Sequence, residues 1–254
     1  GDGTGDATMT FSGTAAAINT ALAGLVYTPA ANYNGSDTLN IVTSDLGGTG
    51  TGGTLTDSDS IALTINAVND APTGADNTII IDEDTPHTFS AADFGYADVD
   101  GDAFAGVRIT TLPAEGTLRL DGVAVSAGDT ITAADLSADD LVFTPAANAN
   151  GTGYASFTFE VYDGTAYDAT PNTITFNVTA VNDAPVNGVP GAQTVNEDTS
   201  LTFSTANGNA VSVSDVDAGS DPLEVTLGVA HGTLSLSGIA GLTFSAGDGT
   251  GDAT

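Results

Sequence analysis

The chain has 254 residues, of which 41% are hydrophobic and 6% aromatic, and it contains neither cysteine nor tryptophan. Its 33 acidic residues outnumber two basic ones, Arg108 and Arg119, so the formal net charge is −31. Such a charge excludes nucleic-acid binding by phosphate neutralisation and disfavours docking on an anionic membrane. No disulfide can form, and no segment reaches the ~20 apolar residues that span a bilayer. We expect no nucleic-acid partner and no membrane insertion.

Secondary structure can be predicted in chain order from the hydrophobic pattern. A short helix is predicted at residues 14–24, with Ile18 and Leu22 on one side, and a second helical turn at 133–139. Apolar and polar residues alternate in four predicted strands: 39–41, 61–65, 157–161 and 174–178. This alternation is typical of antiparallel strands with one face on a core. The sequence therefore predicts an all-β fold of Greek-key β-sandwiches of the Ig type.

The chain also contains an internal repeat. Val-Asn-Asp-Ala-Pro occurs at 68–72 and again 113 residues later, at 181–185. Other matching segments occur in the same order around each copy: 83–90 with 197–204, 98–100 with 215–217, and 116–118 with 232–234. The segment Leu-Val-Phe-Thr-Pro-Ala-Ala-Asn at 141–148 matches 25–32, which precedes the first linker. The order of the matches therefore indicates two alternating domain types.

These matches predict where the domains begin and end. Residues 72–185 are expected to form one complete domain (type B), residues 1–71 the C-terminal part of a type A domain, and residues 186–254 the N-terminal part of the next type A domain. Residues 247–254 are identical to residues 1–8, so the repeating unit is 246 residues long. This overlap favours covalent continuity with neighbouring copies, although strand complementation between separate subunits is the alternative.

Acidic and amide side chains recur at equivalent places in both domain types. Glu-Asp-Thr precedes an early strand, Asp-x-Asp follows in a loop, an Asp ends a late strand, and Asn-Asp occupies the linker. Of the 33 acids 28 are Asp, and calcium binds six to eight such oxygen ligands. Two other interpretations remain: Asn-Asp-x-Pro is a common turn, and a highly acidic surface keeps a protein soluble. In a sandwich with its termini at opposite poles, we expect the late Asp, the early Glu and the linker of one domain to meet the Asp-x-Asp loop of the next.

Together these motifs resemble the bacterial cadherin-like tandem repeats of giant secreted adhesins, of the RTX or VCBS kind exported by type I secretion. The resemblance implies sandwiches in head-to-tail array, Ca²⁺ at the junctions, and a location outside the cell on the bacterial surface. The residues that it assigns to calcium are Glu83, Asp163, Asn182, Asp183, Asp215 and Asp217 at one junction, and Asp45, Asn69, Asp70, Asp98 and Asp100 at the earlier one.

The expected function is structural: a repeat of a long calcium-rigidified adhesin stalk or surface filament, as in a biofilm, with neighbouring copies of the repeat as partners. The alternative is a module that binds a carbohydrate or surface directly, for which the candidate aromatics are Tyr33, Tyr154, Tyr162 and Tyr167. An enzyme is not expected, because His87 and His231 lie in non-equivalent contexts and the chain has no nucleophile elbow.

Overall fold

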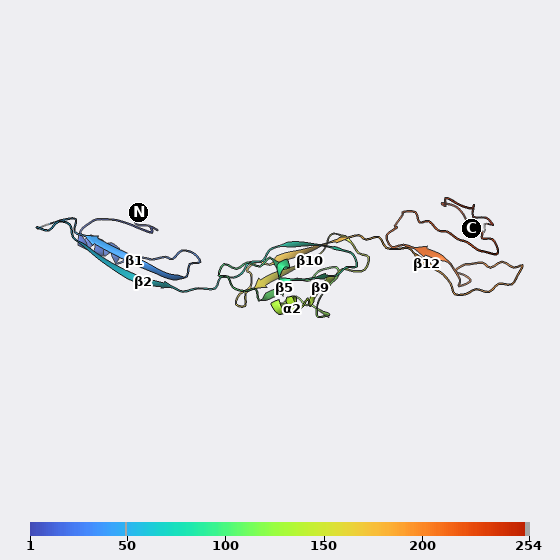
Figure 1. The fold of residues 1–254 in the computed structure, drawn as a ribbon, viewed down its shortest axis with the longest axis horizontal. Helices are drawn as coiled ribbons and strands as arrows, with labels where there is room; N and C mark the ends of the chain where they lie inside the picture. Colours follow the sequence, from blue (N-terminus) through green and yellow to red (C-terminus); the bar gives the residue numbers. More distant parts are fainter. Residues whose placement is uncertain (49, 252–254) are drawn as a thin grey trace.

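A computed structural model describes residues 1–48 and 50–251. The chain forms three parts that follow one another along the long axis of the molecule (Figure 1): an N-terminal part up to the first linker, a central part, and a C-terminal part after the second linker. Only the central part contains a complete sandwich, so its two ends define the poles described below.

The central sandwich has two sheets. The five-stranded sheet has the order β3-β11-β10-β5-β8 and the four-stranded sheet the order β4-β9-β6-β7. The strands of the first sheet are β3 (Asn77–Asp82), β5 (Gly106–Ile109), β8 (Thr130–Thr132), β10 (Gly151–Tyr162) and β11 (Asn172–Thr179). Those of the second are β4 (His87–Thr88), β6 (Thr117–Leu120), β7 (Val123–Ala124) and β9 (Leu141–Thr144).

Alternation along the strands builds the core between these sheets. In β10 every second residue from Ala155 to Val161 is buried, and in β11 Ile174, Phe176 and Val178 are buried in the same way. The ring of Phe143 in β9 stacks on that of Phe176 with centroids 3.8 Å apart, which joins the two sheets. Aromatic pairs of this kind add to the stabilisation from burial alone.

Two short helices close the sides of the core. The 3-10 helix η1 (Ala91–Phe94) and the helix α2 (Ala133–Ser137) each begin with a capping box, formed by Ser90 with Asp93 and by Thr132 with Asp135. Such reciprocal bonds satisfy the free N–H groups at a helix start. The caps therefore explain why helices this short form, and each buries one residue, Phe94 or Leu136.

Strand directions decide which loops share a pole. β3 and β11 pair in parallel, from Asn77 opposite Ile174 to Asp82 opposite Thr179, whereas β10 is antiparallel to β11. The chain therefore enters β3 at the pole of the first linker and leaves β11 at the pole of the second. The turn between β10 and β11 lies at the first pole.

The N-terminal part contains helix α1 (Ala15–Leu22) and a hairpin of β1 (Gly35–Ser44) with β2 (Thr56–Ile65). Thr14 caps α1 by accepting a hydrogen bond from the N–H of Ala17. None of the described residues from 1 to 71 is buried, although the hairpin strands alternate as core strands do. Its apolar side chains therefore lack the covering layer that the central part has.

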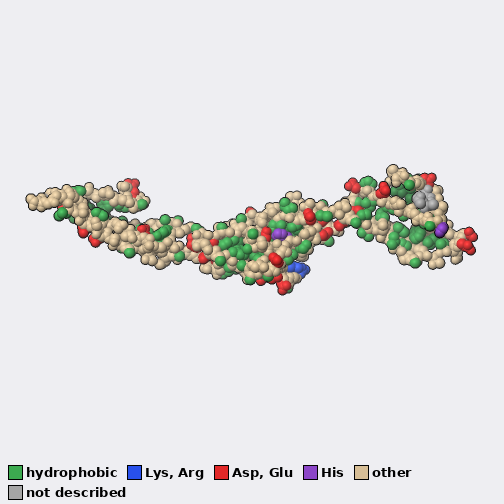
Figure 2. Space-filling view, viewed as in Figure 1, with side chains coloured by type: hydrophobic (Ala, Val, Ile, Leu, Met, Phe, Trp, Pro, Cys, Tyr) green, Lys and Arg blue, Asp and Glu red, His purple; other side chains and the backbone are tan. Residues whose placement is uncertain are grey.

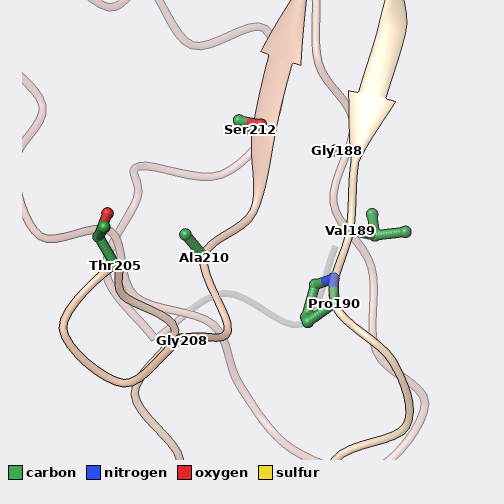
Figure 3. A pocket seen from close by; sticks show the side chains of 7 residues that line it. All are labelled: Gly188, Val189, Pro190, Thr205, Gly208, Ala210 and Ser212. Atoms are coloured by element: carbon green, nitrogen blue, oxygen red, sulfur yellow. The ribbon is translucent and has the colours of Figure 1, made fainter.

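The C-terminal part contains only one small sheet among its described residues, formed by β12 (Val186–Gly188) and β13 (Ser212–Ser214). Its large apolar side chains are exposed, and Figure 2 shows several of them gathered on the surface of this part. A pocket between the two strands is lined by Gly188, Val189, Pro190, Thr205, Gly208, Ala210 and Ser212 (Figure 3). Since this lining contains no charged side chain, we assign the pocket no chemistry.

The structure confirms the predicted all-β fold, and the four predicted strands lie within β1, β2, β10 and β11. The predicted helical segments contain α1 and α2, each shorter than its predicted range. Within the described part of the chain, no helix is both long enough and apolar enough to cross a membrane.

Candidate metal centre

The first group of acids lies at the pole of the first linker, in the loop after η1. Asp98 Oδ1 accepts hydrogen bonds from the backbone N–H groups of Asp100, Gly101 and Asp102, at 2.8, 3.0 and 3.2 Å. These bonds fold the loop around the carboxylate. The other oxygen, Asp98 Oδ2, is buried and has no hydrogen-bond partner. A buried carboxylate oxygen without a partner is costly, so this atom calls for a hydrogen-bond donor or a cation that the described residues do not supply.

Two further carboxylates lie close to that of Asp98. Oxygens of Asp98, Asp102 and Asp163 all lie within 4.8 Å of one another. Asp163 is held in place because its Oδ1 accepts from the N–H groups of Thr165 and Ala166, at 2.5 and 2.6 Å. Three like charges this close repel one another unless a cation lies among them.

The first linker contacts the same group. Asn69 Nδ2 donates to Asp163 Oδ2 at 3.0 Å, and the N–H of Asp70 donates to Asp100 Oδ2 at 2.7 Å. Asn32, from the N-terminal part, lines one shallow pocket together with Asp70 and Asp98. The N-terminal part, the linker and the central part therefore all contribute polar groups at this junction.

The acids also change the proton affinities of their neighbours. Burial, and then the charges of Asp98, Asp163 and Asp102, raise the pKa of the Tyr96 phenol to about 12. Partial burial acts to raise the pKa of Asp163, but the N–H groups of Ala166 and Thr165 and the Asn69 amide outweigh it and lower the pKa overall. Asp163 therefore stays ionised well into the acidic range, as a metal ligand must.

The second group of acids lies at the opposite pole, around the second linker. The N–H of Asp183 donates to Asp217 Oδ2, just as Asp70 donates to Asp100 at the first junction. Asp215 Oδ1 accepts from the N–H groups of Asp217 and Ala218, both at 2.9 Å. Each linker is thus bound to the Asp-x-Asp loop that follows it, with the same atoms at both junctions.

An amide faces the carboxylates at this second junction. The side-chain amide of Asn148 lies 3.1 Å from Asp183 Oδ2 and 3.2 Å from Asp84 Oδ2. With its nitrogen toward them, Asn148 donates to both carboxylates. With its oxygen toward them, three oxygens converge, and that arrangement requires a cation in their midst. Asn148 also donates its backbone N–H to Asp84 Oδ1 at 3.0 Å, which fixes its position.

Glu83 accepts a hydrogen bond from the backbone of the same linker. Its side chain is buried, Oε1 accepts from the N–H of Val181 at 2.7 Å, and Oε2 accepts from Asn150 Nδ2 at 3.0 Å. The N–H of Val181, followed by the amide of Asn150, lowers the pKa of Glu83. The pKa of Asp183, in contrast, is raised by loss of hydration and by the charges of Asp217, Asp84, Glu83 and Asp215. A cation beside Asp183 would offset this repulsion.

The structure corrects the predicted grouping of two residues. Asp163 lies at the first junction, beside Asn69 and Asp98, and not at the second. The reason is the direction of β10, which ends at the first pole. For the same reason Asp45 lies in the turn between β1 and β2, where it accepts from Leu55 and Gly47. That turn is one ten-residue strand, about 30 Å, from the first linker.

The other predicted residues lie at the junctions to which they were assigned. Asn69, Asp70, Asp98 and Asp100 meet at the first, and Glu83, Asp183, Asp215 and Asp217 at the second. Asn182 is also in the second linker, but its Nδ2 donates to the carbonyl of Asp183. Sequence reasoning missed Asp84, Asp102 and Asn148. Asp84 directly follows Glu83 and Asn148 ends a repeated segment, so both had a signal in the sequence.

The side chains named at both junctions are those of Asp, Glu and Asn, which offer carboxylate and amide oxygens as ligands. None of these residues is His or Cys. Carboxylate and amide oxygens in this number fit Ca²⁺, which accepts irregular sets of six to eight such ligands. Zinc or copper would instead call for imidazole or thiolate. The residues therefore fit the cation that the sequence motifs predict.

The central part of the chain is an all-β, Ig-like β-sandwich with polar groups at both poles. Residues 69–179 match the family model of the bacterial Ig domain, so this part of the chain is similar to bacterial Ig-like repeats. Domains of that family are common in surface proteins, often extracellular, and typically without enzymatic activity. A search of the curated proteins found no match.

Proposed function

We propose that this chain is a structural repeat of a long extracellular stalk or filament on the bacterial surface, stiffened by Ca²⁺ at its junctions. The observation that supports this most is the repeated bond between each linker and the next Asp-x-Asp loop, from Asp70 to Asp100 and from Asp183 to Asp217. Carboxylates surround both bonds. The cadherin-like resemblance predicts ions at these places.

Charge repulsion gives the mechanism. Without a cation, the acids at each junction repel one another in a chain of net charge −31, and the linker bends. Bound Ca²⁺ would draw the linker and the loop together. If calcium is present at about 10 to 100 times its Kd, binding stabilises each junction by about 1.4 to 2.7 kcal/mol. Repeated along a stalk, this suffices to order many joints.

Different residues would hold the ion at the two junctions. At the first they are Asp98, Asp102 and Asp163, with Asp98 Oδ2 as the ligand that has no other partner. At the second, Asp84 and Asp183 with the Asn148 oxygen would do so. This role requires no catalytic chemistry from the ion, since the ion acts only as a charge that joins two segments.

A purely structural role also suits the remaining side chains. The ring of His87 is partly buried and packs edge-on against the core residue Phe89, with centroids 4.8 Å apart. The tyrosines of the alternative binding function have partners within the chain. Tyr162 stacks on Tyr167 at 4.4 Å, and Arg108 lies over the Tyr167 ring at 4.2 Å. The hydroxyls of Tyr33 and Tyr154 bond to backbone groups.

The test is a comparison of the full chain in calcium and in chelator, by thermal unfolding and small-angle X-ray scattering. We expect calcium to raise the melting temperature of the central part. The scattering curve should change from that of a mixture of bent and extended conformers to that of one stiff, extended particle. The double variant Asp98→Asn, Asp102→Asn should lose the part of this response that comes from the first junction. The double variant Glu115→Gln, Asp121→Asn, at exposed positions of the same domain, removes the same number of charges and is the control.

Two results would contradict the proposal. One is a wild-type chain whose melting temperature and scattering are the same in calcium and in chelator. The other is an equal loss of response in the junction double variant and in the control double variant, which would show that calcium acts on the total surface charge and not on the junctions.

A further inference from the structure

We infer that the N-terminal and C-terminal parts are complementary halves of one sandwich, and that residues 9–65 of one molecule dock onto residues 186–246 of a second copy of this chain. The exposed apolar faces of both parts would then become one core. The evidence comes from a strand-by-strand comparison with the central sandwich, in which the same elements are all present.

The N-terminal hairpin has the pairing of the central one. In β1 and β2, Leu39 lies opposite Ile61, and in β10 and β11, Phe157 lies opposite Ile174. Counted back from the shared Val-Asn-Asp-Ala-Pro linkers, Ile61 and Ile174 are equivalent positions. β10 has two additional residues, where its register shifts between Gly151 and Ala155. The hairpin is therefore an Ig-type strand pair without its neighbours.

In the central sheet those neighbours are known. β10 pairs on its outer side with β5, and β11 pairs with β3, whereas β1 and β2 form a sheet of two strands only. The repeat places the equivalents of β5 and β3 near residues 222–225 and 191–196, both in the C-terminal part. Free strand edges bind such segments by completing the hydrogen-bond ladder.

Exposure of equivalent residues shows what each half lacks. Ile174 and Ile109 are 0% exposed in the central core, but their equivalents Ile61 and Val225 are 55% and 53% exposed. Likewise Phe89 is fully buried and its equivalent Phe203 is 47% exposed. The core residues of one sandwich are thus divided between the two ends of the chain, and in each half they are exposed to solvent.

The two halves also have the backbone turns of a finished domain. Asn32 and Asn148 are equivalent, and both adopt positive φ, 58° and 54°. Asp84 and its equivalent Asp198 do so as well, at 59° and 61°. Non-glycine residues seldom take this conformation, so the agreement indicates that each half is already shaped for the complete fold.

Within the described residues the two halves lie apart, because the central part separates them (Figure 1). A second copy would also complete the junctions, a point that rests on the proposed calcium function. Its Asp198 would lie beside Asn32, as Asp84 lies beside Asn148. At the second junction, its Asp45 would occupy the place that Asp163 has beside Asp98.

The test uses two variants of the full chain, each blocked at one end. Ile61→Asp places a charge in the face of the N-terminal half, and Val225→Asp does so in the C-terminal half. We expect wild type to form concentration-dependent oligomers, measured by sedimentation velocity and light scattering in chelator. Each variant alone should stay at 25.0 kDa, and their equimolar mixture should give a species of twice that mass and nothing larger. Val123→Asp, on an exposed strand of the central part, is the control and should assemble as wild type does.

The outcomes separate the explanations. A monomeric wild type at all concentrations, or a mixture of the blocked variants that stays at 25.0 kDa, overturns the inference. Large species in that mixture, or a loss of assembly in Val123→Asp, would mean non-specific hydrophobic association and overturns it as well. Because the measurement is made in chelator, failure of the calcium proposal leaves the predicted dimer unaffected.

Discussion

Ile174 and Ile61 offer a matched pair of substitutions, because they are the same residue type at equivalent positions with opposite exposure. Ile174→Ala removes a fully buried side chain from the central core, and truncations of this kind cost about 2 to 5 kcal/mol. Residues 69–179 lose about 2.1 cal/mol/K of entropy each on folding. With a cost of about 3 kcal/mol, the melting temperature of the central domain should fall by about 13 °C.

Ile61→Ala should behave differently in a dilute chain. Its side chain is more than half exposed, so the change should cost less than about 0.5 kcal/mol and leave the central transition where it is. Differential scanning calorimetry in chelator, first dilute and then concentrated, would measure both variants. At high concentration a second transition should appear for the completed sandwich, and Ile61→Ala should lower it as far as Ile174→Ala lowers the first.

The reasoning fails if both alanine variants lower the same transition equally in dilute solution. The N-terminal hairpin would then already be packed within one molecule, and the exposure seen in the structure would not describe the chain in solution. An unchanged second transition in Ile61→Ala would show instead that oligomers form without burying this face.

Three other outcomes can be checked on the same chain. In chelator, Asp98→Asn should stabilise the central domain by about 1 kcal/mol, since its new amide can donate to Asp102 or Asp163. In calcium, the variant should melt below wild type. Equal shifts of the melting temperature in both buffers would contradict the proposed calcium site. Because the pKa of Glu83 is lowered, its ionised side chain stabilises the fold fully at pH values above its ordinary pKa of 4.5, and this contribution disappears as the pH falls through the lowered pKa. Glu83→Gln should therefore show a flatter decline of melting temperature in acid. An unchanged slope would refute this role of Glu83. Without calcium, raising the sodium chloride concentration from about 0.01 to 1 M shortens the screening length from about 30 to 3 Å. The repulsion between the acids then weakens, so the scattering curve should move part of the way toward the one measured in calcium.

Much of the fold could be predicted from local patterns. β10 and β11 alternate so regularly that their buried residues can be read from the sequence, and the same is true of β1 and β2. The pattern does not reveal whether the apolar face is covered. Ile61 and Ile174 have similar neighbours along the chain, and only the structure shows that the first has no opposing layer.

The acids at the junctions could be predicted by residue type but not all by position. Asp98 and Asp100 stand in a repeated motif, and in the structure the linker N–H of Asp70 donates to Asp100 Oδ2. Asp163 could not be placed, because the sequence does not state at which pole a strand ends. Asp102 has no equivalent in the second loop, where Gly219 occupies the corresponding place, so the repeat gave no reason to single it out.

The parallel pairing of β3 with β11 has a mechanical consequence. These are the first and last strands of the central sandwich, they lie side by side, and the chain enters one and leaves the other at opposite poles. Tension along the axis therefore pulls the two strands past each other and loads all their backbone bonds, from Asn77 to Asp82, at the same time. A pair pulled apart from one end would instead break one bond after another. The central sandwich can thus resist tension along its axis as a unit that yields only when the whole ladder fails.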